Sequence, residues 1–176
     1  MSVLFRATEQ FMASVRNDLM RPHRFAHERV GFVTVKAAAG ADSLVLLAQD
    51  YFPVADSEYV NDRTFGAMIG QEALRKALDL ALLNPVGVFH VHMHLLSQQR
   101  LWFSAIDLSE QRNFVPDFFK VRPTMPHGAL VLSPQSAAGL VWRNASDVQP
   151  ISEFNTVGAQ LKIIAAALDG STDYSG

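Results

Sequence analysis

The sequence feature that most constrains the fold is the segment HVHMH, which carries His90, His92 and His94 at alternate positions. Alternate side chains of a β-strand project from the same face, so these histidines should stand side by side if the segment is a strand. Three charged imidazoles at that spacing would repel one another, and neutral imidazole is the form that binds zinc. The segment therefore predicts a strand with a metal site on one face.

A metal site needs ligands from elsewhere in the chain. An H-x-H pair supplies two ligands, and a catalytic zinc site has a third protein ligand and an open position for water. Asp107, in the tetrad SAID that begins at Ser104, is the candidate third ligand. The same S-x-x-D pattern is also a capping box, in which both side chains satisfy backbone donors of a helix. Glu28 is the candidate general base, and a solvated charge at a strand end is its structural alternative.

Helices and strands are expected to alternate along the chain. Apolar spacing predicts a helix over Val3–Leu19, and Gln71–Leu83 is rich in alanine and leucine. A short helix should begin at Ser104, with Pro116 and Pro123 breaking what comes after. Ile151–Leu168 fits either a helix or a strand. Strands are predicted at Val30–Val35, Ser43–Ala48, Val86–His94, Ala129–Leu132 and Gly139–Trp142. This order predicts an α/β or α+β fold, and 176 residues suit one domain.

Composition excludes several classes of function. The chain has no cysteine, which removes disulfide scaffolds, cysteine nucleophiles and thiolate metal sites. The net charge is 15 − 17 = −2, so there is no basic excess for nucleic acid. No apolar stretch approaches a membrane span of about 20 residues, and the first residues lack the apolar core of a secretory signal. We therefore expect a cytoplasmic protein with neither nucleic-acid nor membrane partners. Only 18% of the residues are charged, which predicts a rather apolar surface.

These residues, taken in order, resemble the JAB/MPN domain with a JAMM metalloprotease motif. The matching features are Glu28-x-x-Gly31 on a first strand, H-x-H after an Ala/Leu-rich helix, and then Ser104-x-x-Asp107. The segment HGALVLS resembles a later strand of that family. The resemblance is closest to prokaryotic JAB proteins, including those found beside ubiquitin-activating-like and conjugating-like proteins.

The resemblance also implies an architecture. It covers about residues 3–143, so the whole chain, 1–176, would be a single JAB/MPN-like domain with a C-terminal extension at 144–176. Such a domain is a central mixed β-sheet flanked by helices, in a cytidine-deaminase-like arrangement.

The chemistry that the resemblance implies is specific. One Zn²⁺ per chain would be bound by His92, His94 and Asp107. Glu28 would activate the zinc-bound water, and Ser104 would hydrogen-bond the tetrahedral intermediate. The substrates of the family are peptide or isopeptide bonds, commonly at the tail of a ubiquitin-like protein. A ubiquitin-like protein or peptide is thus the expected substrate, with E1-like and E2-like proteins as candidate partners.

The histidine segment departs from the family pattern. It has three histidines, no following proline and a longer spacer before the S-x-x-D tetrad. The ligand pair is therefore either His90 with His92 or His92 with His94. We favour His92 and His94, because that pair needs the smaller insertion before Asp107. His90 would then lie behind the ligands or simply on the strand.

Two other functions fit parts of the sequence. HVHMHLL also fits the histidine-triad pattern of nucleotide hydrolases and transferases, in which the central histidine, here His92, attacks phosphorus without a metal. That family places a Gly-Gln-containing segment before the triad and ends soon after it, whereas more than 80 residues follow His94 here. A catalytically silent MPN scaffold is the third alternative, although every expected ligand type is present.

Overall fold

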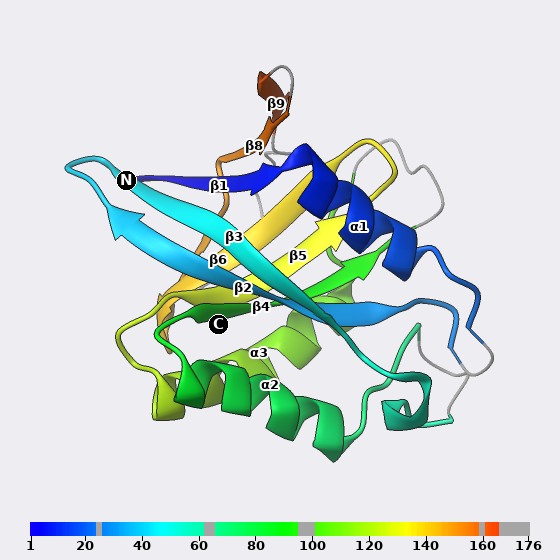
Figure 1. The fold of residues 1–176 in the computed structure, drawn as a ribbon. Helices are drawn as coiled ribbons and strands as arrows, with labels where there is room; N and C mark the ends of the chain where they lie inside the picture. Colours follow the sequence, from blue (N-terminus) through cyan, green and yellow to red (C-terminus); the bar gives the residue numbers. More distant parts are fainter. Residues whose placement is uncertain (24–25, 62–65, 95–100, 159–160, 166–176) are drawn as a thin grey trace.

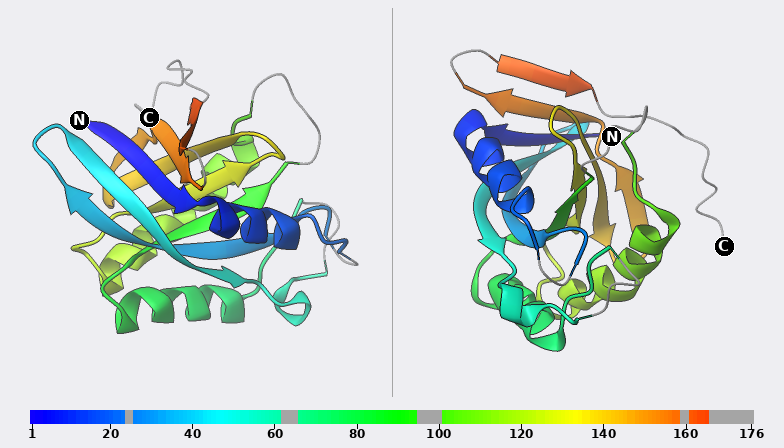
Figure 2. Two further views of the ribbon diagram at one scale, coloured as in Figure 1. Left: turned by 45° about the horizontal axis from the view of Figure 1, so that its top comes forward. Right: turned by 90° about the vertical axis from the view of Figure 1, so that its right-hand side faces the viewer.

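The chain folds into one curled, mixed β-sheet with helices on both faces (Figures 1 and 2). The computed structural model describes residues 1–23, 26–61, 66–94, 101–158 and 161–165. The helices are α1 (Glu9–Leu19), the 3₁₀ helix η1 (Asp56–Glu58), α2 (Gln71–Leu83) and α3 (Ala105–Val121). The strands are β1 (Ser2–Thr8), β2 (Val30–Ala39), β3 (Ser43–Pro53), β4 (Gly87–Met93), β5 (His127–Leu132), β6 (Ala137–Asn144), β7 (Asp147–Pro150), β8 (Glu153–Val157) and β9 (Leu161–Ala165). A mixed sheet flanked by helices confirms the expected α+β class.

The described strands form a nine-stranded sheet in the order β7-β6-β5-β4-β2-β3-β1-β8-β9. β4 lies inside this sheet, antiparallel to β2 and parallel to β5. Figure 1 shows α1 on one side of the sheet and α2 with α3 on the other. The sheet therefore has a separate apolar core on each face, and β4 contributes to both.

The two faces of β4 carry different side chains. Phe89, Val91 and Met93 belong to the core that includes α1. His90 and His92 point the other way, towards α3, where they lie near Phe114 and Asp107. The period of two in a strand thus separates the histidines from the large apolar residues, as the sequence predicts.

The first predicted helix, Val3–Leu19, is half wrong. Its first part is β1, which lies between β3 and β8 and pairs in parallel with both. Val3, Phe5 and Ala7 alternate into the core, so tertiary pairing outweighs the helical spacing of the apolar residues. The helix begins only after Thr8, whose hydroxyl accepts a hydrogen bond from the Phe11 N–H at 3.1 Å.

The remaining predictions of elements agree with the structure to different degrees. The helix Gln71–Leu83 is confirmed with the same bounds. Ser104 is the N-cap of α3 as expected. Pro116 does not break this helix, which continues to Val121 and ends before Pro123, the second predicted breaker. Val115 and Phe118 are both buried on either side of the proline, and their packing compensates for the missing N–H donor. The polar link at residues 97–100 lies outside the described residues.

The segment that the sequence left ambiguous forms strands. β8 and β9 are antiparallel, and Ile151 and Phe154 are buried in the core that includes α1. β7, β8 and β9 all follow residue 143, so this part of the chain continues the same sheet. Residues 166–168 lie outside the described part.

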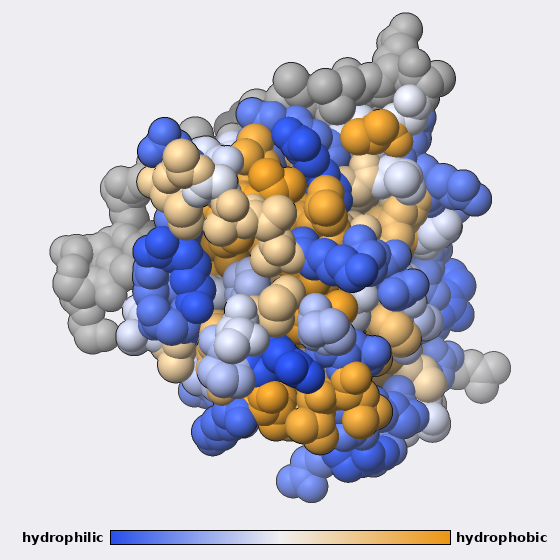
Figure 3. Space-filling view, turned by 60° about the vertical axis from the view of Figure 1, so that its left-hand side comes forward, coloured by the Kyte–Doolittle hydropathy of each residue, from blue (hydrophilic) through white to orange (hydrophobic). Residues whose placement is uncertain are grey.

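Exposed apolar side chains occur on several elements. Leu82 and Leu83 at the end of α2 are 50% and 76% exposed, and Leu47 and Phe52 of β3 are 40% and 38% exposed. Figure 3 shows apolar groups separated by polar side chains on one side of the molecule. Within the described residues, no helix has the length and apolar character needed to span a membrane.

Candidate metal site

The pairing of β2 with β4 brings Glu28 to the histidines. Phe32 pairs with His90 and Val30 pairs with His92 in this antiparallel ladder. The same register, continued by two residues on each chain, places Glu28 opposite His94. The Glu28 Oε1 and His94 Nε2 atoms are 3.9 Å apart. Two segments distant in sequence thus meet at one end of the β2–β4 pair.

His92 and His94 direct the same ring atom to the same point. Their Nε2 atoms are 3.3 Å apart. His94 follows β4, and its N–H donates to the Leu132 carbonyl at 2.9 Å, which extends the pairing with β5. The His92 side chain is 2% exposed, whereas that of His94 is 20% exposed. The His92 imidazole therefore lies at the buried side of the site, and the His94 imidazole at the side that solvent reaches.

Asp107 reaches the same point from the start of α3. Its Oδ2 lies 3.5 Å from His92 Nε2 and 3.8 Å from His94 Nε2. The same oxygen accepts the Ser104 N–H at 2.7 Å, and the Ser104 Oγ accepts the Asp107 N–H at 3.1 Å. The tetrad is therefore a capping box, as one interpretation of the sequence predicts. The cap also holds the carboxylate against the histidines, so the two interpretations are compatible.

These three atoms fit one metal ion. Bonds of 2.0–2.2 Å in a tetrahedral zinc site put neighbouring ligand atoms about 3.3–3.5 Å apart. The three distances here are 3.3, 3.5 and 3.8 Å, so small side-chain movements bring all three atoms to that spacing. Glu28 also belongs to this neighbourhood, because one ligand atom each from Glu28, His92 and His94 lie within 4.8 Å of one another.

The charges of the site suit a divalent cation. Burial raises the pKa of Asp107, but its interaction with His92 and its hydrogen bonds with Ser104 outweigh this effect, so the pKa lies below its ordinary value. The Asp107 and Glu28 side chains are 22% and 28% exposed. An ionised carboxylate thus lies beside two imidazoles at a point that solvent reaches.

His90 lies apart from this group. Its ring packs edge-on against Phe32 and Phe114, with centroids 5.7 and 5.4 Å away. Burial, and to a lesser extent the neighbouring His92, lowers the pKa of His90 to about 3. Within the described residues, its Nδ1 has no hydrogen-bond partner. The structure therefore brings together His92 and His94, the pair that the spacing before Asp107 favours.

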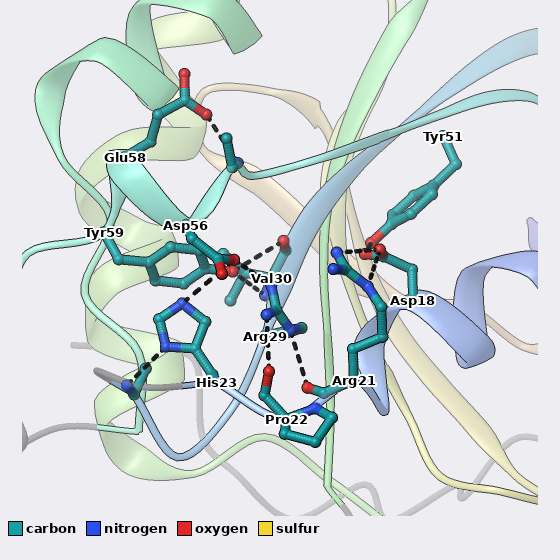
Figure 4. Close-up of polar contacts among 12 residues, drawn as sticks. Asp18, Arg21, Pro22, His23, Arg29, Val30, Tyr51, Asp56, Glu58 and Tyr59 are labelled. Carbon is teal, nitrogen blue, oxygen red and sulfur yellow. Dashed lines mark hydrogen bonds and ion pairs between the residues drawn. The ribbon is translucent and has the colours of Figure 1, made fainter.

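The segment that carries Glu28 is fixed by its neighbour Arg29, which the sequence analysis missed. Figure 4 shows the Arg29 guanidinium surrounded by oxygen atoms. It donates to Asp56 Oδ1 at 2.7 Å and to the carbonyls of Arg21 and Pro22 at 2.9 and 2.8 Å. The Arg29 side chain is only 3% exposed. A buried arginine with three hydrogen-bond acceptors next to Glu28 fixes the entrance to β2.

Two further contacts fix the same entrance. The Tyr59 hydroxyl accepts the Val30 N–H at 2.8 Å. The Gly66 carbonyl accepts the N–H groups of His27 and Glu28 at 2.8 and 3.0 Å. A Cβ atom on Gly66 would lie 3.2 Å from Glu28 Oε2, so a glycine leaves room for the carboxylate. None of these partners is close to Glu28 in sequence, and no sequence pattern indicated them.

No protein-family model matches the chain, and no curated protein is significantly similar to it.

Proposed function

We propose that the protein is a zinc-dependent hydrolase of the JAMM type that cleaves a peptide or isopeptide bond. The observation that carries this proposal is the convergence of His92 Nε2, His94 Nε2 and Asp107 Oδ2 within 3.8 Å, beside the Glu28 carboxylate. Two imidazoles and one carboxylate are a ligand set that zinc accepts in hydrolytic enzymes. The three partly exposed side chains leave one side of the site open for water and substrate.

The roles of the residues follow from their positions. Zinc held by His92, His94 and Asp107 would supply a Lewis acid that polarises the scissile carbonyl and lowers the pKa of water. The Glu28 carboxylate takes a proton from the attacking water as the oxygen–carbon bond forms. It then passes that proton to the amine that leaves as the carbon–nitrogen bond breaks.

Ser104 is suited to stabilise the developing negative charge. Its Oγ accepts the Asp107 N–H, which leaves the hydroxyl hydrogen available. Within the described residues, no hydrogen-bond acceptor holds that hydrogen. The hydroxyl therefore donates to the carbonyl oxygen of the substrate as charge accumulates there.

The proposal extends to the fold and the substrate. A mixed sheet with helices on both faces is consistent with a JAB/MPN architecture. The tail of a ubiquitin-like protein is the proposed substrate, and the cytoplasm is the proposed location. The proposed substrate depends on the resemblance of Glu28, H-x-H and Ser104-x-x-Asp107 to the JAMM motif, and the proposed location on the composition of the chain. An extended tail of that kind would pair as a strand beside the site.

The histidine-triad alternative is less well supported. It makes His92 the nucleophile, which has to reach a phosphorus atom. The His92 side chain is 2% exposed, and its Nε2 faces His94 and Asp107. This burial favours a ligand over a nucleophile.

The test of the proposal is the zinc content of protein purified without a chelator or a metal-affinity tag. We expect about one zinc per chain by elemental analysis. The loaded protein should then cleave a ubiquitin-like fusion, and a chelator should stop the cleavage. Protein that is zinc-free and does not bind added zinc would reject the proposal. Nucleotide hydrolysis without metal would then support the histidine triad, and absence of both activities a scaffold.

A further inference from the structure

Beneath the candidate metal site, the structure buries polar atoms that lack partners. Among the described residues, His90 Nδ1, His92 Nδ1 and both amide atoms of Gln111 have no hydrogen-bond partner. The Gln111 side chain is 1% exposed. A buried polar group without a partner destabilises the folded state, so native proteins rarely retain one without a reason. Four such atoms on two neighbouring elements indicate a hydrogen-bond network among these side chains, closed directly or by a buried water.

The position of Gln111 connects these atoms. Asp107, Gln111 and Phe114 are spaced i, i+4 and i+7 on one stripe of α3. Asp107 lies beside His92, with 3.5 Å between Oδ2 and Nε2, and Phe114 packs against His90 at 5.4 Å between ring centroids. The helical turn between these two contacts is the turn that carries Gln111. Its side chain therefore faces the interval between His92 and His90 on β4.

We propose that Gln111 is a positioning residue for the zinc ligand His92, an inference that rests on the proposed function. The Gln111 amide oxygen accepts a hydrogen bond from His92 Nδ1–H, directly after a side-chain rotation or through one buried water. The amide nitrogen donates to His90 Nδ1 in the same way. Glutamine offers one acceptor and one donor, which matches one protonated and one unprotonated ring nitrogen.

The physical reason is the tautomer of His92. Its Nε2 has a lone pair for a metal only if the ring proton is on Nδ1. Buried Nδ1–H without an acceptor would favour the opposite tautomer and let the ring rotate. An acceptor behind a histidine ligand fixes both the tautomer and the orientation of the ring, and loss of such a partner typically weakens metal binding about 10–100-fold.

The test is the zinc affinity of the full-length protein, measured by competition with a chelator. Gln111→Leu should bind zinc about 10–100-fold more weakly than the unsubstituted chain. Leucine fills a similar volume, so the variant should still fold, although it leaves two buried histidine nitrogens without a partner. Gln149→Leu is the matched control, since among the described residues Gln149 Nε2 is also buried without a partner but lies on β7, an edge strand three strands from β4. It should keep the zinc affinity of the unsubstituted chain.

Gln111→Glu separates hydrogen bonding from packing. A carboxylate keeps the acceptor for His92 Nδ1–H, so this variant should bind zinc more tightly than Gln111→Leu. In the zinc-loaded protein, NMR should detect a slowly exchanging His92 Nδ1–H that is lost in Gln111→Leu. Equal zinc affinity of Gln111→Leu and the unsubstituted chain would overturn the role of Gln111 alone. No zinc binding by the unsubstituted chain would overturn the proposed function, and this inference with it.

Discussion

Two buried histidines of this protein have opposite surroundings. His127, at the start of β5, is 0% exposed, and both of its ring nitrogens have backbone partners. Nδ1 accepts the Val88 N–H at 3.1 Å, and Nε2 donates to the Arg122 carbonyl at 3.0 Å. His92, on the adjacent β4, is 2% exposed, and its Nε2 faces a second imidazole and a carboxylate instead.

The difference teaches that burial alone does not mark a functional histidine. His127 stacks on Phe118 with 16° between the ring planes, and burial lowers its pKa to about 4. It is thus a neutral core residue that joins β4, β5 and the end of α3. His92 is almost equally buried, yet its Nδ1 has no hydrogen-bond partner among the described residues. What separates His127 from His92 is that backbone groups satisfy both ring nitrogens of His127, whereas Nε2 of His92 faces a second imidazole and a carboxylate.

The largest expected effect that tests this comparison is loss of zinc. His92→Ala and His94→Ala should each abolish stoichiometric zinc binding, because each removes one of three protein ligands. His90→Ala should retain zinc within about tenfold, as expected for a residue behind the ligands. Elemental analysis and chelator competition measure both results. His127→Asn is the control that should keep about one zinc per chain.

The opposite pattern would reverse the assignment of the ligands. If His90→Ala released zinc and His94→Ala retained it, the pair would be His90 and His92. If all four variants retained zinc, the metal site would lie elsewhere, and His92 would be as structural as His127.

The second effect separates the base from the ligands. Glu28→Gln keeps the shape of the side chain and removes its ability to take a proton. Turnover should fall by about 10²–10⁴ while zinc remains bound. Glu72→Gln, a change of an exposed glutamate on α2, is the matched control and should leave turnover unchanged. Loss of zinc together with activity in Glu28→Gln would instead make Glu28 a ligand.

The third effect tests whether the cap of α3 is also catalytic. Ser104→Ala removes both the cap and the proposed donor to the substrate oxygen. We expect turnover to fall about 10²–10³-fold. The free energy of unfolding should fall by about 1 kcal/mol, the usual cost of losing an N-cap. Loss of stability with full turnover would show that Ser104 only caps the helix.

Much of the candidate site could be predicted because its residues follow local rules. Alternation along a strand predicts that His92 and His94 share a face, and S-x-x-D predicts a helix start that presents Asp107. The segment Gln71–Leu83 has high helix propensity and, unlike β1, is not paired with a strand of the described sheet, so its predicted bounds are those observed. In each case, the information lies within a few neighbouring residues.

The rest depends on contacts between distant segments. The spacing of Val3–Leu19 indicated a helix, but β3 and β8 pair with its first half. Glu28 is held in place by the ion pair of Arg29 with Asp56 and by the Gly66 carbonyl, and no local sequence pattern predicts these contacts. Gln111 becomes notable only once its amide is found buried without a partner. Strand pairing and burial of this kind are properties of the whole fold.

The smallest expected effect concerns His127 itself and the dependence of stability on pH. Its pKa is lowered from 6.5 to about 4 in the folded protein, so the unfolded chain binds the proton more readily. The contribution of this histidine to stability is therefore complete above about pH 6.5 and is lost as the pH falls towards 4. From pH 7 to pH 5, it should reduce the free energy of unfolding by about 2 kcal/mol.

His127→Asn isolates that contribution, because asparagine can still accept the Val88 N–H but does not titrate. Denaturant unfolding of metal-free protein at pH 7 and pH 5 measures how much free energy of unfolding each variant loses between the two pH values. The loss in His127→Asn should be smaller than in the unsubstituted chain by about 2 kcal/mol, and any titration of other groups common to both cancels. Equal losses would mean that His127 is protonated as easily in the folded state as in the unfolded one. In that case, the two backbone hydrogen bonds of His127 would not keep its imidazole neutral. His127 would then no longer serve as the example of a structural histidine with which His92 is compared.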